Sequence, residues 1–224
     1  LNYISFITSP LQMAFSLEGN ILNGNLVCFI ILQTLIIQIP LLVALVTGDL
    51  ISGEAAMGTI RLIATRPVSR TRLLMSKFLA GALYVMLLLL WLGILSLGLG
   101  LLFFGHGDLI VLKSEELIII QSDDTFWRLM AAFAVAFLSL LVVASFSLML
   151  SCFAENSIGP IISTMAVIIL FTIIGTMEIP FFDLIKPFLF TTHMVIWRNF
   201  FDNPLPLEQI RESLLILAAH VVLF

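Results

Sequence analysis

Four long stretches without a single charged residue constrain the fold of this chain more than any other feature. They run over Asn25–Thr47, Phe78–Phe104, Leu129–Phe153 and Ile158–Met177. A helix rises about 1.5 Å per residue, so about 20 residues cross a hydrocarbon core about 30 Å thick. Soluble domains carry about 25% charged residues, whereas this chain has 11% charged and 61% hydrophobic residues. We therefore expect an all-α, polytopic membrane protein that forms one transmembrane domain over residues 1–224.

The two ends of the chain bear on the number of spans. The chain begins at Leu1 and ends at Phe224, inside a further apolar run, Leu214–Phe224. Eleven helical residues would reach about 16 Å, roughly half of a bilayer core. We expect four complete spans and a truncated fifth, in a fragment that lacks an earlier helix and the end of its last helix.

Positive charge is dense between the first two apolar stretches. Five basic residues fall within 17 positions there: Arg61, Arg66, Arg70, Arg72 and Lys77. Lysine and arginine close to the ends of spans favour the cytoplasmic side. The sequence thus predicts a cytoplasmic segment over residues 48–77, in a multi-pass protein of the plasma membrane, with a prokaryotic inner membrane as the expected setting.

Within that segment, Glu54–Arg66 has the pattern of a short amphipathic helix. At 100° per residue, one narrow edge holds four residues: Glu54, Gly58, Arg61 and Thr65. Pro67 would end this helix, because proline disfavours a helical conformation at the residue before it. Ser69 is then the expected N-cap of the next helix. Two interpretations stay open, an ordinary loop at the membrane surface and a docking helix for a cytoplasmic partner.

The same segment resembles a known family. It reads GDLISGEAAMGTIRLIATRPVSRTRLLMSKFLAG, which is similar to the signature of ABC-2 type permeases, the membrane subunits of a class of ATP-binding-cassette exporters. The matching positions are Asp49, Gly53, Glu54, Gly58, Thr59, Pro67, Val68, Ser69, Arg70 and Lys77. Their order, their spacing and their place between two spans all agree with the family pattern.

The resemblance implies a fold of six helices, of which the complete spans here would be the second to the fifth. It also implies a short cytoplasmic helix that couples to a separate ATPase, and a dimer with the substrate path at the subunit interface. The residues expected to serve ATPase coupling are Asp49, Gly53, Glu54, Gly58, Thr59, Arg61, Pro67 and Arg70. The expected partners are an ABC ATPase, a second permease copy or paralogue, and the lipid bilayer, with no nucleic acid.

The sequence contains no Gly-x-x-x-x-Gly-Lys-Ser/Thr motif, the loop that cradles phosphates in many ATPases. We therefore expect ATP to be bound by the partner, and no catalytic residue, cofactor or metal site in this chain. Charged residues are also absent from the four apolar stretches, whereas ion-coupled carriers commonly keep one at depth. This disfavours a secondary transporter.

Two further features concern the substrate path and the outer side. Gln33 and Gln38 lie inside the first stretch, where amides either pack against other helices or line a translocation path. Residues 179–208 form the expected extracellular segment, in which Ile179–Phe201 is apolar but holds charges and two prolines. We expect this part to be re-entrant or interfacial rather than a span.

These observations favour the permease subunit of an ABC-2 type exporter. The alternative is a scaffold subunit that transmits the movement of an ATPase to other proteins without transporting anything itself. The two differ in whether a dimer encloses a continuous path across the bilayer.

Overall fold

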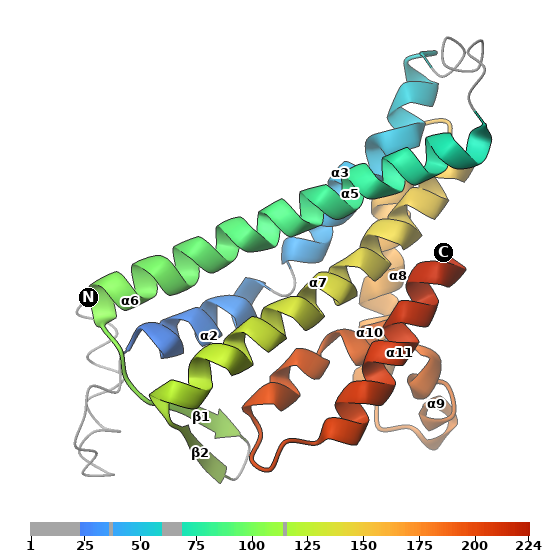
Figure 1. Cartoon of the computed structure of the whole chain (residues 1–224). Coiled ribbons are helices and arrows are strands. Elements are labelled where there is room, and N and C mark those ends of the chain that lie inside the picture. Colours follow the sequence, from blue (N-terminus) through green and yellow to red (C-terminus); the bar gives the residue numbers. More distant parts are fainter. Residues whose placement is uncertain (1–22, 36–37, 60–68, 114–115) are drawn as a thin grey trace.

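The structure is a computed structural model that describes residues 23–35, 38–59, 69–113 and 116–224. Long helices dominate it (Figure 1): α3 (Gln38–Ala56), α5 (Arg70–Gly93), α7 (Ser122–Phe153) and α8 (Ile158–Thr176). A π-helical segment, η1 (Ile94–Leu99), and α6 (Gly100–Phe104) extend α5 into one helix over Arg70–Phe104. Among the described residues, four helices are long and apolar enough to cross a membrane, and they begin at Gln38, Arg70, Ser122 and Ile158.

The first span differs from the expected one. The stretch Asn25–Thr47 does not form one helix, because α2 (Gly24–Leu35) ends before α3 begins at Gln38. Pro40 lies in the first turn of α3, where its missing N–H would have no partner within the helix. The helix long enough to span is therefore α3, and it continues nine residues beyond Thr47.

The fold is not purely helical. Two antiparallel strands, β1 (Leu109–Lys113) and β2 (Glu116–Ile120), form a hairpin between α6 and α7. Leu109 pairs with Ile120 in the register of the two strands, and both side chains are buried. The all-α expectation is wrong at this point, because a run rich in isoleucine, leucine and valine on one edge of the core suits a strand.

The segment after α8 is divided into short pieces, as its prolines predict. In chain order these are α9 (Pro180–Asp183), η2 (Lys186–Phe188), α10 (Phe190–Met194) and η3 (Ile196–Phe201). Pro180 begins α9 and Pro187 lies within η2. Ile179–Phe201 is therefore not one continuous helix, and its place relative to the bilayer stays a prediction. The last helix, α11 (Leu207–Leu223), begins seven residues before the predicted run, at Leu207 instead of Leu214, and lies beside α7 and α10 (Figure 1).

Small residues bring α3 and α7 into close contact. The Ser147 hydroxyl donates to the Ala44 carbonyl at 3.1 Å, and the Ser151 hydroxyl accepts from the Ser52 N–H at 2.9 Å. An added Cβ on Gly48 would lie 2.9 Å from Ser147 Oγ and 3.1 Å from Ile161 Cγ1 of α8. In a bilayer, helices associate through such close packing and interhelical hydrogen bonds. Gly48 therefore sets the distance between α3, α7 and α8.

We predict that Gly48→Ala lowers stability relative to Gly93→Ala. Both changes remove a glycine from a helix, which alone favours the helix by about 1 kcal/mol. At Gly93 the added Cβ would meet the Phe133 ring at an ordinary 3.8 Å. At Gly48 the added Cβ overpacks the seam, the close contact of α3 with α7 and α8, and overpacking typically costs about 1–3 kcal/mol. Unfolding of the detergent-solubilised variants measures the difference, and equal midpoints for the two variants would contradict the close α3–α7 contact.

Candidate functional site

Several of the residues that carry the family resemblance lie where α3 ends and α5 begins. Glu54 lies in the last turn of α3 and Lys77 near the start of α5, and their side chains form an ion pair through Glu54 Oε1 and Lys77 Nζ. The two side chains are 25% and 19% exposed, respectively. At this partial burial the pair is less screened by water than a surface pair. It ties the ends of two helices that are separated by 23 positions in the sequence.

The end of α3 is shaped by Gly58 and Thr59. Gly58 has a φ of 72°, a left-handed conformation that favours glycine just after a helix. Its N–H donates to the Ala55 carbonyl at 3.0 Å, and the Thr59 hydroxyl donates to the Glu54 carbonyl at 3.1 Å. These bonds satisfy carbonyls that the helix end would otherwise leave unpaired. Gly58 and Thr59 thus turn the chain away from the axis of α3 just after the helix ends at Ala56.

Asp49 and Gly53 lie one turn apart on α3. Asp49 is exposed, and an added Cβ on Gly53 would overlap its carboxylate. Gly53 therefore leaves room for the Asp49 side chain to lie against the helix. This places an exposed negative charge near the buried face of α3 that packs on α7.

The predicted separate helix Glu54–Arg66 is wrong in its first part. Glu54–Ala56 continue α3, and the helix ends there because Gly58 adopts the left-handed conformation. Arg61 and Pro67 lie outside the described residues, so their roles stay predictions. The segment 48–77 contains the end of α3 and the first turns of α5, and its cytoplasmic coupling role stays a prediction.

The predicted cap of the following helix is confirmed. Ser69 is extended, and its hydroxyl accepts from the Arg72 N–H at 3.3 Å. Arg70 is the first residue of α5 and is exposed together with Arg72. The first turn of α5 therefore presents two exposed cations, seven and five residues before Lys77.

Gln33 and Gln38 lie on different helices, α2 and α3, and their place on a translocation path stays a prediction. Gln33 is exposed on α2, and Gln38 is the exposed first residue of α3. Gln38 lines a cavity of about 500 Å³ between α2, α3 and the Arg70–Phe104 helix, which also includes Trp91 and Ser96. The side-chain hydrogen-bonding groups of the lining belong to Gln38, Ser96 and the indole N–H of Trp91, and the other lining residues are apolar or glycine.

Sequence reasoning missed Arg128. This residue lies in α7 and is only 7% exposed. One guanidinium nitrogen donates to the carbonyls of Phe200 at 2.9 Å and Asp202 at 3.0 Å. Main-chain carbonyls more than 70 positions away leave no signal in the sequence. Arg128 fixes the end of η3 against α7.

The structure shows no site for a metal in the part of the chain that it describes, where no group of three His, Cys, Asp or Glu side chains comes together. His193 bridges the C-terminal segment instead. Its Nε2 donates to the Pro187 carbonyl at 2.9 Å, and its Nδ1 lies 2.9 Å from the Ser213 hydroxyl. In the neutral ring this arrangement makes Nδ1 the acceptor.

The described part of the chain is a helical protein with four candidate membrane spans. The chain belongs to the family described as "Protein of unknown function (DUF2705)", whose profile matches residues 2–224. It is 34% identical over 119 residues to the "Uncharacterized protein YhcI" of Bacillus subtilis (strain 168). That alignment covers 50% of this chain and 37% of the relative, so the chain spans little more than a third of that protein's length. No solved structure matches the chain.

We predict that the Glu54–Lys77 pair stabilises the junction, which is the end of α3 together with the start of α5, by about 1 kcal/mol. This is the upper end of the range for an ion pair that water partly screens. Glu54→Gln should lower the free energy of unfolding by this amount, and exchanging the two charges (Glu54→Lys with Lys77→Glu) should recover most of it. Asp183→Asn is the matched control, because Asp183 pairs with Lys186 at 2.7 Å but is 61% exposed. An effect of Glu54→Gln no larger than that of Asp183→Asn would show that the pair contributes nothing.

Proposed function

We propose that this chain is the membrane subunit of an ATP-driven exporter of the ABC-2 type, in which a separate ATPase drives movement of the spans. The observation that carries the proposal is the ion pair of Glu54 with Lys77 beside the left-handed Gly58. These residues belong to the pattern on which the family resemblance was drawn, and they converge at one helix junction. The four candidate spans support the same class.

The geometry of the junction is suited to transmit a push from outside the membrane. Because Glu54 holds Lys77, a force on this end acts on α3 and α5 together. Asp49, Arg70 and Arg72 are exposed nearby and offer charges of both signs to a partner. ATP would be bound and hydrolysed in that partner, while this chain receives the movement and passes it along α3.

The movement would be passed on by the small residues between α3 and α7. Gly48 meets Ser147 there, and the Ser151 hydroxyl accepts from the N–H groups of Ile51 at 3.2 Å and Ser52 at 2.9 Å. Because these small residues and hydrogen bonds hold α3 closely against α7, a tilt of α3 would carry α7 with it. In the dimer of the proposal, this tilt would open the path at the interface with a second copy or paralogue.

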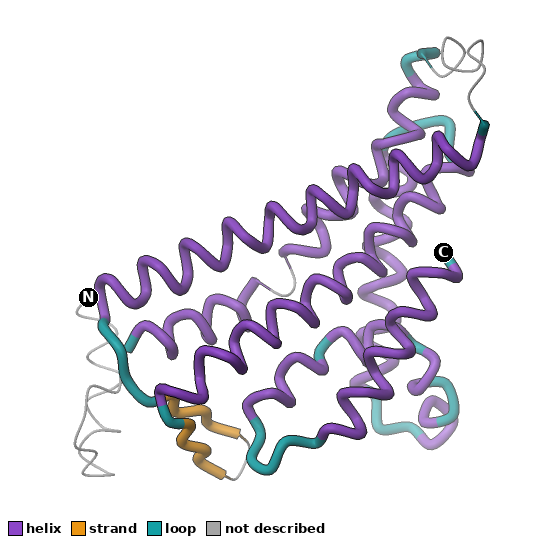
Figure 2. The backbone as a smooth tube through the Cα atoms, in the orientation of Figure 1, coloured by secondary structure: helices purple, strands orange, loops and turns teal. Residues whose placement is uncertain are grey.

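Orientation follows from the same junction. The end of α3 and the start of α5 lie at one end of the long helices, and the β1–β2 hairpin lies at the other (Figure 2). The basic residues Arg70, Arg72 and Lys77 favour the cytoplasm for the junction. The hairpin would then be extracellular, in a plasma membrane.

We predict opposite labelling of Ser69→Cys and Gln121→Cys in a background of Cys28→Ala and Cys152→Ala. Ser69 begins the junction, and Gln121 lies between the hairpin and α7; both are exposed. A membrane-impermeant thiol reagent added to intact cells should label position 121 and spare position 69 until the membrane is opened. Labelling of position 69 from outside would overturn the orientation and the docking proposal.

We predict that Glu54→Lys uncouples the chain from the ABC ATPase of the proposal. The reversed charge repels Lys77 and separates α5 from the end of α3, so substrate-stimulated ATP hydrolysis in reconstituted vesicles should fall at least about tenfold, the effect of about 1.4 kcal/mol. Arg61→Glu tests the rest of the predicted docking segment in the same assay, and it should also lower substrate-stimulated ATP hydrolysis.

Glu155→Lys is the matched control, because Glu155 is an exposed glutamate in the turn between α7 and α8. It should leave coupled hydrolysis unchanged. Equal activity of all three variants would refute the coupling role. An ATPase that binds and responds to Glu54 while no candidate substrate moves would favour the scaffold alternative.

A further inference from the structure

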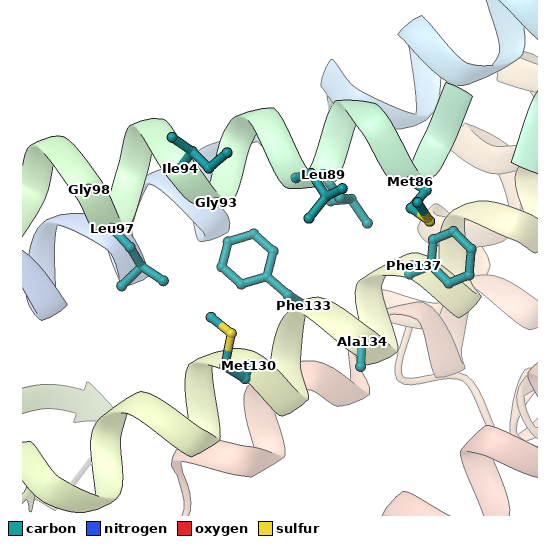
Figure 3. A pocket seen from close by; sticks show the side chains of 11 residues that line it. Met86, Leu89, Gly93, Ile94, Leu97, Gly98, Met130, Phe133, Ala134 and Phe137 are labelled. Carbon is teal, nitrogen blue, oxygen red and sulfur yellow. The ribbon is translucent and has the colours of Figure 1, made fainter. Parts of the chain in front are cut away.

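A long apolar groove lies between the Arg70–Phe104 helix and α7, apart from the junction described above. Its volume is about 510 Å³, and Figure 3 shows Phe133 reaching from α7 toward the π-helical segment. Every residue that lines it is apolar or glycine. Two of them, Leu90 and Ile94, are more than half exposed, at 52% and 62%. The groove is therefore open along one side and accepts a hydrocarbon, but it offers no side-chain hydrogen bond.

Two glycines give the groove its width. An added Cβ on Gly98 would meet nothing within 4 Å, and one on Gly93 would meet only the Phe133 ring at 3.8 Å. Met86 and Met130 line the same space from the two helices. Methionine side chains are flexible and polarisable, so they adapt to chains of varied shape. This lining suits a flexible aliphatic chain better than a rigid ring.

The length of the groove matches one leaflet of a bilayer. On the Arg70–Phe104 helix the lining runs from Met86 to Gly98, which at about 1.5 Å per residue is about 18 Å. Half of a hydrocarbon core is about 15 Å. The groove thus has the depth that one acyl chain occupies, and its open side lets that chain enter from the surrounding leaflet.

Two aspartates lie in the first turn of α7, about 10 Å along the helix beyond the hairpin-side end of the groove at Met130. Asp123, Trp127 and Met130 follow one another at spacings of four and three, so they share one face of α7, and Met130 lines the groove. Asp123, Asp124 and Asp108 are all exposed there, and Asp108 Oδ1 accepts from the Ser122 N–H at 3.0 Å.

The nearest cation on α7 does not offset this charge at the surface. Arg128 is buried, and its guanidinium donates to the main-chain carbonyls of Phe200 and Asp202. Trp127 is 43% exposed beside the two aspartates, in a position typical of the bilayer interface. The outer end of the groove therefore favours a positive head group over a negative one.

We infer that the groove between the Arg70–Phe104 helix and α7 binds a single-chain amphiphile with a cationic head group, taken from the leaflet on the hairpin side. The chain lies between Gly98 and Phe133, and the head group lies beside Asp123 and Asp124. This site stands independently of the proposed function, because binding needs neither ATP nor a partner.

The test uses two photoreactive probes with the same 16-carbon chain, one ending in trimethylammonium and the other in sulfate. Each carries a diazirine in the chain and is added to the purified full chain in nanodiscs of zwitterionic lipid, and mass spectrometry locates the labelled residues. We expect the ammonium probe to label the groove about fivefold more than the sulfate probe, the upper end of what one exposed ion pair contributes. Replacing Asp123 and Asp124 by asparagine should remove this preference.

Two matched pairs of variants separate the chain site from the head-group site. Gly98→Leu fills the groove and should lower labelling by both probes several-fold, whereas Ala80→Leu, at an exposed position of α5 outside the lining, should not. Ala134→Leu fills the groove from α7 in case Gly98→Leu disturbs the helix. Glu155→Gln is the charge control at the opposite end of α7.

The outcomes are distinct. Equal labelling by the two probes overturns the cationic head group, and labelling that neither Gly98→Leu nor Ala134→Leu reduces overturns the groove as the binding site. Neither result bears on the coupling role of Glu54, which is measured with the ATPase present.

Discussion

The close approach of α3 to its neighbours is the constraint on which the rest of the structure depends. Hydrocarbon tails are as apolar as leucine, so helices in a bilayer are held by contact and hydrogen bonds rather than by exclusion of water. Thr47 and Gly48 serve three neighbours at once: an added Cβ on Gly81 of α5 would lie 2.9 Å from Thr47 Cγ2, and Gly48 meets α7 and α8. Two consecutive small positions therefore fix α3 as the central helix.

The junction inherits its geometry from this seam. Glu54 lies six residues beyond Gly48 on the same helix. Its position relative to α5 is therefore set by how α3 packs against α7 and α8 at Gly48. Ser52, whose N–H donates to the Ser151 hydroxyl of α7, lies between Gly48 and Glu54. A site that rests on a rigid helix end can respond as a unit, whereas a flexible loop would absorb a push locally. This is the physical reason to regard Glu54 as part of the helix framework rather than as an isolated surface charge.

The sequence was informative where local chemistry decides the structure. Three of the four uncharged stretches predicted long helices, Ser69 predicted the start of α5, and the prolines predicted the divided segment after α8. It was misleading where tertiary contacts decide. Apolar composition does not show that a helix stops at Leu35 and restarts at Gln38, and the amphipathic pattern after Glu54 hid the continuation of α3. Arg128 was missed because its partners are main-chain carbonyls. Every residue has such a carbonyl, so residue types in the sequence do not identify these partners.

The π-helical segment η1 has a consequence for how sequence length is tolerated. A π-helix closes its hydrogen bonds over one residue more than an α-helix, and each residue of an α-helix turns the chain by about 100°. The face that Gly100–Phe104 present to α2 therefore depends on the number of residues in Ile94–Leu99 as well as on their kind. An added Cβ on Gly24 would lie 2.6 Å from the Gly100 carbonyl carbon, a contact that only this alignment permits. A chain one residue shorter in this segment would rotate Gly100 away from Gly24 and place a leucine or phenylalanine against the α2 backbone.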